Sequence, residues 1–154
     1  MIYFIIGMSV NIMDKDMKRS IILDNYQNSY HRKRLDDNNN YTKINSRNVS
    51  CIDNIDLYVN VEDNVIKEIY FDGEACVISI SSTSIMCRLL EGKTIDEAIK
   101  IIDNYDNMVE EREYNSDILE EAIVYDDVSK QPSRKTCATL TWHGLYRKLL
   151  ELKK

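Results

Sequence analysis

Apolar and polar residues alternate without a break over residues 55–61, and this pattern constrains the fold more than any other feature of the sequence. Such alternation is typical of a β-strand with one buried face, because successive side chains point to opposite sides of a sheet. Turn-forming residues follow at 62–64, and residues that favour β-structure return over 65–72. The two runs therefore predict an antiparallel hairpin.

The rest of the chain predicts helices around this hairpin. Residues 94–97 form the capping-box motif Thr-Ile-Asp-Glu, which begins an apolar helical stripe that reaches about residue 109. The first helix is expected over residues 14–28, with one apolar face made of Met17, Ile21, Ile22 and Tyr26. Further helices are expected over residues 81–90 and 138–152, with a short helical piece near 118–123.

One polar segment and one short strand complete the predicted fold. Residues 28–47 are rich in Asn, Arg, Lys and Asp and contain hardly any apolar side chain, so a loop is expected there. A third strand is expected over residues 75–80, after Gly73. We therefore predict the α+β class, with a small three-stranded antiparallel sheet packed with helices.

The length of 154 residues suits one domain, which we predict over residues 14–154. Residues 1–13 are apolar, but they have no positively charged start and lead straight into charged residues, so they make a poor signal peptide. They are also too short to cross a bilayer. We interpret them as an N-terminal leader whose status stays open, and we expect a cytoplasmic protein without a membrane partner.

Charge and motif content exclude several classes of function. The net charge is −6, and residues 48–132 carry six basic and twenty acidic side chains. A nucleic-acid surface needs a basic excess, so no nucleic-acid partner is expected. The chain also lacks a Gly-rich phosphate loop, a serine nucleophile elbow and an HExxH motif, which argues against a nucleotide-dependent enzyme.

Four cysteines, Cys51, Cys76, Cys87 and Cys137, are candidates for chemistry. None belongs to a C-x-x-C pair, so spacing alone leaves a metal site open beside the more common role of a small buried hydrophobe. Cys87 lies in the apolar run of a predicted helix, where we expect the buried role. The other three stand at the ends of predicted elements. Cys137, at the start of a helix, should have a lowered thiol pKa.

The sequence Cys51-Ile52-Asp53 is the clearest local signal for a metal. In an extended chain, residues two apart share a face, so the thiolate and the carboxylate would lie within reach of one cation. The two histidines, His31 and His143, have no partner at metal-ligand spacing, and we expect neither to bind a metal.

Three motifs stand in order along the chain: Asn48-Val-Ser-Cys-Ile-Asp53, Phe71-Asp-Gly-Glu-Ala-Cys-Val-Ile-Ser79 and Cys137-Ala-Thr-Leu-Thr-Trp142. Together they resemble the N-P-x-C-G-D, F-x-G-x-G-C-x-I-S and C-A-T-L-x-W patterns of the SufU family, which belongs with the IscU and NifU-type iron–sulfur assembly proteins. The likeness runs from about residue 22 to residue 150. The 61 positions from Cys76 to Cys137 leave room for the insertion that marks SufU against IscU.

This resemblance implies a Zn²⁺ site made of Cys51, Asp53, Cys76 and Cys137, with Cys51 as the sulfur-accepting thiol. It implies a SufS-type cysteine desulfurase as partner, which transfers persulfide sulfur to Cys51, and a downstream iron–sulfur assembly complex. Thr136 stands where IscU proteins have His, and this favours the SufU side. Arg134 is expected to hold Asp53 or to stabilise a persulfide anion. The chain would be a sulfurtransferase-type accessory protein rather than a stand-alone enzyme.

The chain departs from the family pattern beside the cysteines. Ile52 replaces the Gly between Cys51 and Asp53, Val49 replaces a Pro, and Ala75 replaces the Gly before Cys76. Loss of glycine is expected to stiffen the loop around Cys51. Two alternatives stay open. A scaffold that assembles a [2Fe–2S] cluster would use iron at the same ligands, and the changed loop gives support to a zinc-stabilised interaction domain without transfer activity.

Overall fold

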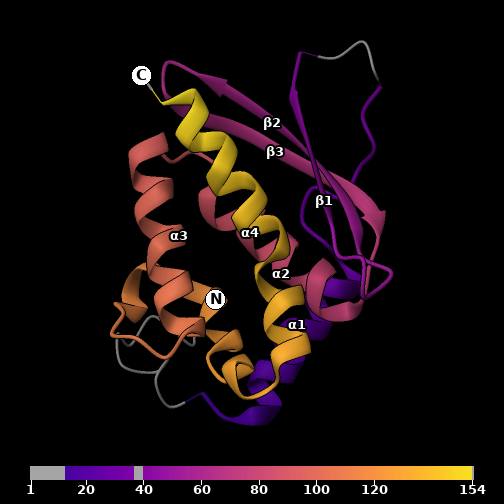
Figure 1. Ribbon diagram of the computed structural model, residues 1–154, viewed down its shortest axis with the longest axis vertical. Coiled ribbons are helices and arrows are strands. Elements are labelled where there is room, and N and C mark those ends of the chain that lie inside the picture. The colour runs from indigo at the N-terminus through magenta and orange to yellow at the C-terminus, as the bar shows by residue number, and fades with distance from the viewer. Residues whose placement is uncertain (1–12, 37–39, 154) are drawn as a thin grey trace.

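The computed structural model describes residues 13–36 and 40–153, in which a sheet is covered on one face by helices (Figure 1). The antiparallel strands β1 (Thr42–Arg47), β2 (Asn54–Glu62) and β3 (Val65–Glu74) lie in the order β1-β2-β3. The α-helices are α1 (Lys15–Gln27), α2 (Val77–Leu90), α3 (Ile95–Val109) and α4 (Pro132–Leu152). Short 3-10 helices follow α3: η2 (Ser116–Ile118), η3 (Glu120–Tyr125) and η4 (Val128–Lys130). The predicted α+β class is confirmed.

The predicted hairpin is confirmed as β2 and β3. Leu57 pairs with Phe71 and Val59 pairs with Ile69, and all four side chains are buried. Asp63 and Asn64 have φ values of 54° and 61°, as a two-residue hairpin turn requires. The alternation of the sequence thus places one face of β2 in the core.

The third strand is β1, so the prediction of a loop over residues 28–47 is wrong for its last part. β1 pairs with β2 from Thr42 opposite Val59 to Arg47 opposite Asn54. Ile44 is its one large buried apolar side chain. The strand is therefore held mainly by backbone pairing with β2, which a hydrophobicity pattern does not reveal.

The strand predicted over residues 75–80 is also wrong, because the chain enters α2 there. Cys76 is the N-cap of α2, and its side chain accepts from the backbone N–H of Ser79. A short apolar run fits a buried strand and a buried helix equally well. Nearly all of α2 is buried, so it shows no amphipathic period, and the predicted helix over residues 81–90 is only its second part.

The other helices match the predictions more closely. Thr94 and Glu97 form the predicted reciprocal capping box of α3. α4 begins at Pro132, six residues before the predicted start, with proline in the first turn, where its missing N–H costs no hydrogen bond. In α1 the buried residues are Ile21 and Asn25, whereas Met17 and Tyr26 are each 38% exposed, so the predicted apolar face is wrong in part.

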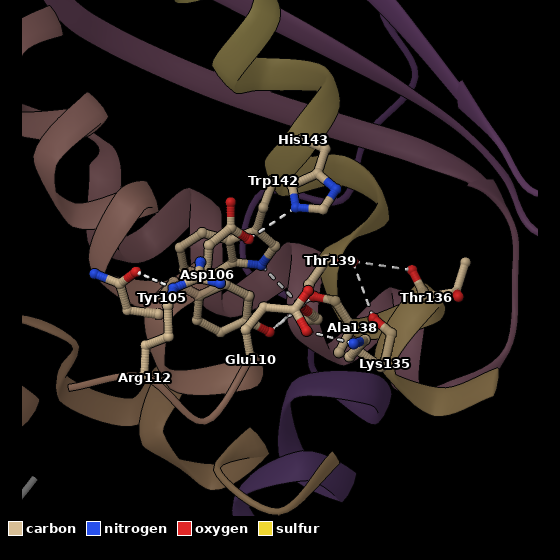
Figure 2. A network of polar contacts seen from close by, with 12 residues as sticks. Tyr105, Asp106, Glu110, Arg112, Lys135, Thr136, Ala138, Thr139, Trp142 and His143 are labelled. Atoms are coloured by element: carbon tan, nitrogen blue, oxygen red, sulfur yellow. Dashed lines mark hydrogen bonds and ion pairs between the residues drawn. The ribbon is translucent and has the colours of Figure 1, made fainter. Parts of the chain in front are cut away.

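The core brings α2, α3 and α4 together behind the sheet. The ring of Trp142 stacks on that of Tyr105 (Figure 2), and the ring centroids are 3.8 Å apart. The indole N–H of Trp142 donates to Ser82 Oγ at 2.8 Å, and the Tyr105 hydroxyl donates to the carbonyl of Ala138 at 2.8 Å. These buried bonds hold α4 at positions one and five residues beyond Cys137.

No helix within the described residues has the length and apolar character needed to cross a membrane. Met13, the first described residue, is buried. Residues 1–12 of the predicted leader lie outside the described residues.

Candidate metal centre

Four side chains from three parts of the fold meet at one point. The sulfur atoms of Cys51, Cys76 and Cys137 and a carboxylate oxygen of Asp53 all lie within 4.8 Å of one another. Four donors around one zinc ion lie about 3.8 Å apart, given zinc–sulfur bonds of about 2.3 Å. The donor set of three thiols and one carboxylate therefore fits a tetrahedral cation with small side-chain adjustments.

A tight turn between β1 and β2 holds Cys51 and Asp53. The backbone N–H of Cys51 donates to the carbonyl of Asn48 at 3.1 Å, and that of Asn48 donates to the carbonyl of Asp53 at 3.0 Å. The Cys51 thiol lies 3.7 Å from Asp53 Oδ1. The two side chains approach each other as predicted, but through this turn and not through an extended chain.

Asp53 is almost fully buried, at 1% exposure, and both of its carboxylate oxygens accept hydrogen bonds. Oδ1 accepts from the backbone N–H of Cys76 at 2.8 Å, and Oδ2 accepts from the hydroxyl of Ser79 at 2.5 Å. Burial by itself raises the pKa of Asp53, but these bonds and those from the Cys137 and Cys76 thiols outweigh it and lower the pKa. The carboxylate is thus kept ionised, as a metal ligand must be.

The thiol at a helix N-terminus is that of Cys76, not that of Cys137. The backbone N–H of Ser79 lies 3.5 Å from Cys76 Sγ. Cys137 lies in the second turn of α4 because the helix begins at Pro132. Burial first, and then hydrogen bonds with Asp53 and Cys76, raise the pKa of the Cys137 thiol, so the predicted lowering is wrong. A bound cation would act in the opposite sense by favouring the thiolate.

Exposure distinguishes Cys51 from the other cysteines. Cys51 is exposed, Cys76 is half-buried, and Cys137 is buried. A cavity of about 720 Å³ opens over Cys51 and Asp53, with Arg34, Arg47 and Glu74 among its lining residues. A reactant arriving from solvent would therefore meet Cys51 first.

The structure separates the remaining candidates from this cluster. Cys87 is fully buried in the core, as expected. His143 lies 2.8 Å from Asp106 (Figure 2), and His31 lies 2.9 Å from Glu91. Arg134 is exposed in the first turn of α4, and the groups that bond the Asp53 carboxylate are those of Ser79 and the cysteines.

Sequence reasoning missed Ser79 as part of the site. Its hydroxyl donates to Asp53 and lies 3.2 Å from the carbonyl of Cys137. The available signal was its place three residues after Cys76, which becomes meaningful only once Cys76 is known to cap a helix.

Comparisons with known proteins give matches over most of the chain. Residues 17–138 match the family model described as the NifU-like N-terminal domain. The chain is 32% identical over 139 residues to the zinc-dependent sulfurtransferase SufU of Bacillus subtilis, covering 90% of this chain and 92% of the relative. It is also 32% identical to the iron–sulfur cluster assembly scaffold protein IscU of Thermotoga maritima, covering 90% of this chain and 96% of that protein.

Solved structures show the same fold. The crystal structure of FiSufU from Fervidobacterium islandicum AW-1 aligns with a TM-score of 0.75 at 30% identity, covering 81% of this chain and 90% of that one. A NifU-like N-terminal protein from Brucella abortus aligns with a TM-score of 0.76 over 92% of this chain and all of that one. Because the identity is only 18%, this structural likeness supports the fold alone.

Proposed function

This chain belongs to the family of NifU-like N-terminal domains in iron–sulfur cluster assembly, and from this premise we propose that it is a zinc-dependent sulfur acceptor. The observation that carries the proposal is the meeting of three cysteines and Asp53 at one point, with Cys51 alone of the three cysteines exposed. Cys51, Asp53, Cys76 and Cys137 would hold the zinc ion. When bound, zinc would keep its cysteine ligands as thiolates near neutral pH.

In the proposed reaction, Cys51 accepts sulfur from the persulfide of a SufS-type cysteine desulfurase. The Cys51 thiolate attacks the terminal sulfur of the donor persulfide, and a new sulfur–sulfur bond forms on Cys51. The donor's own sulfur–sulfur bond breaks, and the donor cysteine leaves as a thiolate. The persulfide formed on Cys51 then passes to a downstream assembly complex. Free thiols at the site suit a reducing compartment such as the cytoplasm.

Arg134 is proposed as the residue that stabilises the persulfide anion. It is exposed and precedes Cys137 by three residues on α4, one turn of the helix. The alternative proposal for Arg134, that it holds Asp53, has less support because Ser79 and Cys76 already bond both carboxylate oxygens.

A second candidate function is a scaffold for a [2Fe–2S] cluster. It is favoured by the likeness to the IscU protein of Thermotoga maritima, and three thiolates with a carboxylate can hold iron as well as zinc. Against it, the residue before Cys137 is Thr136, which has no imidazole to offer a cluster. Its hydroxyl donates to the carbonyl of Pro132 within the same helix.

Metal analysis and a transfer assay test the proposal together. We expect one zinc per chain in the purified protein, and a higher rate of sulfide release when it is added to a SufS-type desulfurase with cysteine and a reductant. Cys51→Ala should abolish this increase, whereas Cys87→Ala, which changes a core cysteine, should retain it. Absence of any increase with zinc-loaded protein would overturn the transfer role in favour of an interaction domain. Iron with the absorption of a [2Fe–2S] cluster would favour the scaffold.

A further inference from the structure

Ser79 is the buried polar residue that ties the candidate ligands together. It lies in the first turn of α2 and is 1% exposed. Its hydroxyl is 2.5 Å from Asp53 Oδ2, 3.2 Å from the carbonyl of Cys137 and 3.6 Å from Cys76 Sγ. A hydroxyl has one hydrogen, and the short contact with the Asp53 carboxylate is the strongest place for it.

The bond from Ser79 determines how the Asp53 carboxylate can face a cation. The backbone N–H of Cys76 donates to Oδ1 of Asp53, and the Ser79 hydroxyl donates to Oδ2. A carboxylate offers about four lone-pair positions, so each oxygen keeps one more, and the thiols of Cys51 (3.7 Å from Oδ1) and Cys76 (3.9 Å from Oδ2) lie against these oxygens. With both oxygens anchored, the carboxylate cannot rotate freely about its bond to the chain, so it stays beside the three sulfur atoms, where a cation would take the place of the thiol protons.

The other buried hydroxyls of α2 show that this arrangement is not a general property of the helix. Ser81 bonds Tyr125, and Ser82 bonds the carbonyl of Ala138. Thr83 bonds Thr141, and Ser84 bonds Asn25. Those four hydroxyls connect α2 to neighbouring elements, whereas that of Ser79 bonds a candidate ligand.

We propose that Ser79 is a positioning residue that orients Asp53 toward the cation and thereby sets the metal affinity of the site. The inference rests on the proposed function, because it presupposes a metal at these four side chains. Groups that orient metal ligands typically contribute 10- to 100-fold to affinity. Ser79 is therefore expected to act on metal binding through Asp53, without contacting the metal itself.

The test compares Ser79→Ala with Ser84→Ala in the full-length protein. Both variants remove one buried hydroxyl from α2, but Ser84 bonds Asn25 and the backbone N–H of Tyr30, and neither of these residues is a candidate metal ligand. We expect Ser79→Ala to weaken Zn²⁺ and Co²⁺ binding about 10- to 100-fold in competition with a chelator. The visible absorption of bound Co²⁺ should shift as well. Ser84→Ala should bind both ions as the unchanged protein does, and circular dichroism checks that each variant is folded.

A double-mutant cycle with Asp53→Ala distinguishes positioning from a general loosening of the site. If Ser79 acts through Asp53, adding Ser79→Ala to Asp53→Ala causes no further loss of affinity. A further loss of tenfold or more in that background would overturn the inference, and so would an unchanged affinity in Ser79→Ala alone. If the unchanged protein bound neither ion, the proposed metal site itself would be wrong. That result differs from a protein that binds metal with an affinity independent of Ser79.

Discussion

At the scale of single residues, the loop beside Cys51 combines exposed apolar side chains with an exposed thiol. Val49 is 94% exposed and Ile52 is 69% exposed. Because both side chains are largely exposed, packing within this chain stabilises neither of them much. Ile52 is β-branched, and its backbone is more restricted than that of the glycine typical of SufU proteins. We therefore expect Ile52 to limit how far Cys51 can move relative to Asp53.

Replacing Ile52 with glycine tests this restriction. We expect Ile52→Gly to raise the rate of desulfurase-dependent sulfide release severalfold, because Cys51 gains freedom to reach the donor sulfur. Zinc content should stay at one per chain, and the free energy of unfolding should fall by about 1 kcal/mol or less.

Ile52→Ala is the matched control, since it removes the apolar side chain while keeping a non-glycine backbone. It should leave the rate of sulfide release near that of the unchanged protein. An equal increase in both variants would show that the side chain, and not backbone stiffness, limits sulfur acceptance.

At the scale of elements, the end of β3 decides where Cys76 is placed. Gly73 has a φ of 154° and pairs with Ile55 of β2. A Cβ atom at this position would lie 2.1 Å from the carbonyl oxygen of Asn54, a backbone atom that cannot move without disturbing β2. Only glycine lets β3 lie this close to the start of β2, three residues before Cys76.

Gly73→Ala should therefore lower the free energy of unfolding by about 2 kcal/mol or more, measured by urea denaturation. It should also weaken zinc binding, because β2 and the Cys76 turn must move apart. Gly92→Ala is the comparison: its φ of 88° is strained for alanine, but no atom lies within 4 Å of the added Cβ. Its cost should be about 1 kcal/mol, with unchanged zinc affinity. Equal effects of the two changes would contradict the role given to Gly73.

At the scale of the whole molecule, the candidate site joins parts of the chain that are far apart in sequence. Cys51 and Asp53 come from the turn before β2, Cys76 from the start of α2, and Cys137 from α4. α4 contacts β1, β2, α2 and α3, so a cation at this point would link the sheet to the helices. Bound metal should therefore stabilise the entire fold and not only the loop around Cys51.

Removal of the metal tests this linkage. At a free zinc concentration about 1,000 times the dissociation constant, binding stabilises the folded state by about 4 kcal/mol. For a chain of this size, we expect chelation to lower the Tm by roughly 8 to 16 °C in calorimetry. Cys87→Ala should show the same shift on chelation, whereas Cys76→Ala should show almost none. If chelation left the Tm of zinc-loaded protein unchanged, a metal link between the sheet and the helices would be contradicted.

The sequence by itself determined the features whose signals are local. The alternation over residues 55–61 with its turn specified the hairpin, and Thr94 with Glu97 specified the start of α3. Three ordered motifs also identified the four side chains that the structure brings together. Each of these features depends on residues close in sequence, or on a pattern shared across a family.

Tertiary structure alone decided the rest, because the deciding contacts join distant residues. β1 is a strand because β2 supplies its backbone partners, although Ile44 is its one large buried apolar residue. The apolar run after Gly73 suits a strand or a helix, and in the folded chain it is a helix packed against α1, β3 and α4. The role of Ser79 depends on its contact with Asp53, 26 positions away. A sequence pattern records which residues are apolar, but not which distant group will satisfy a buried hydroxyl.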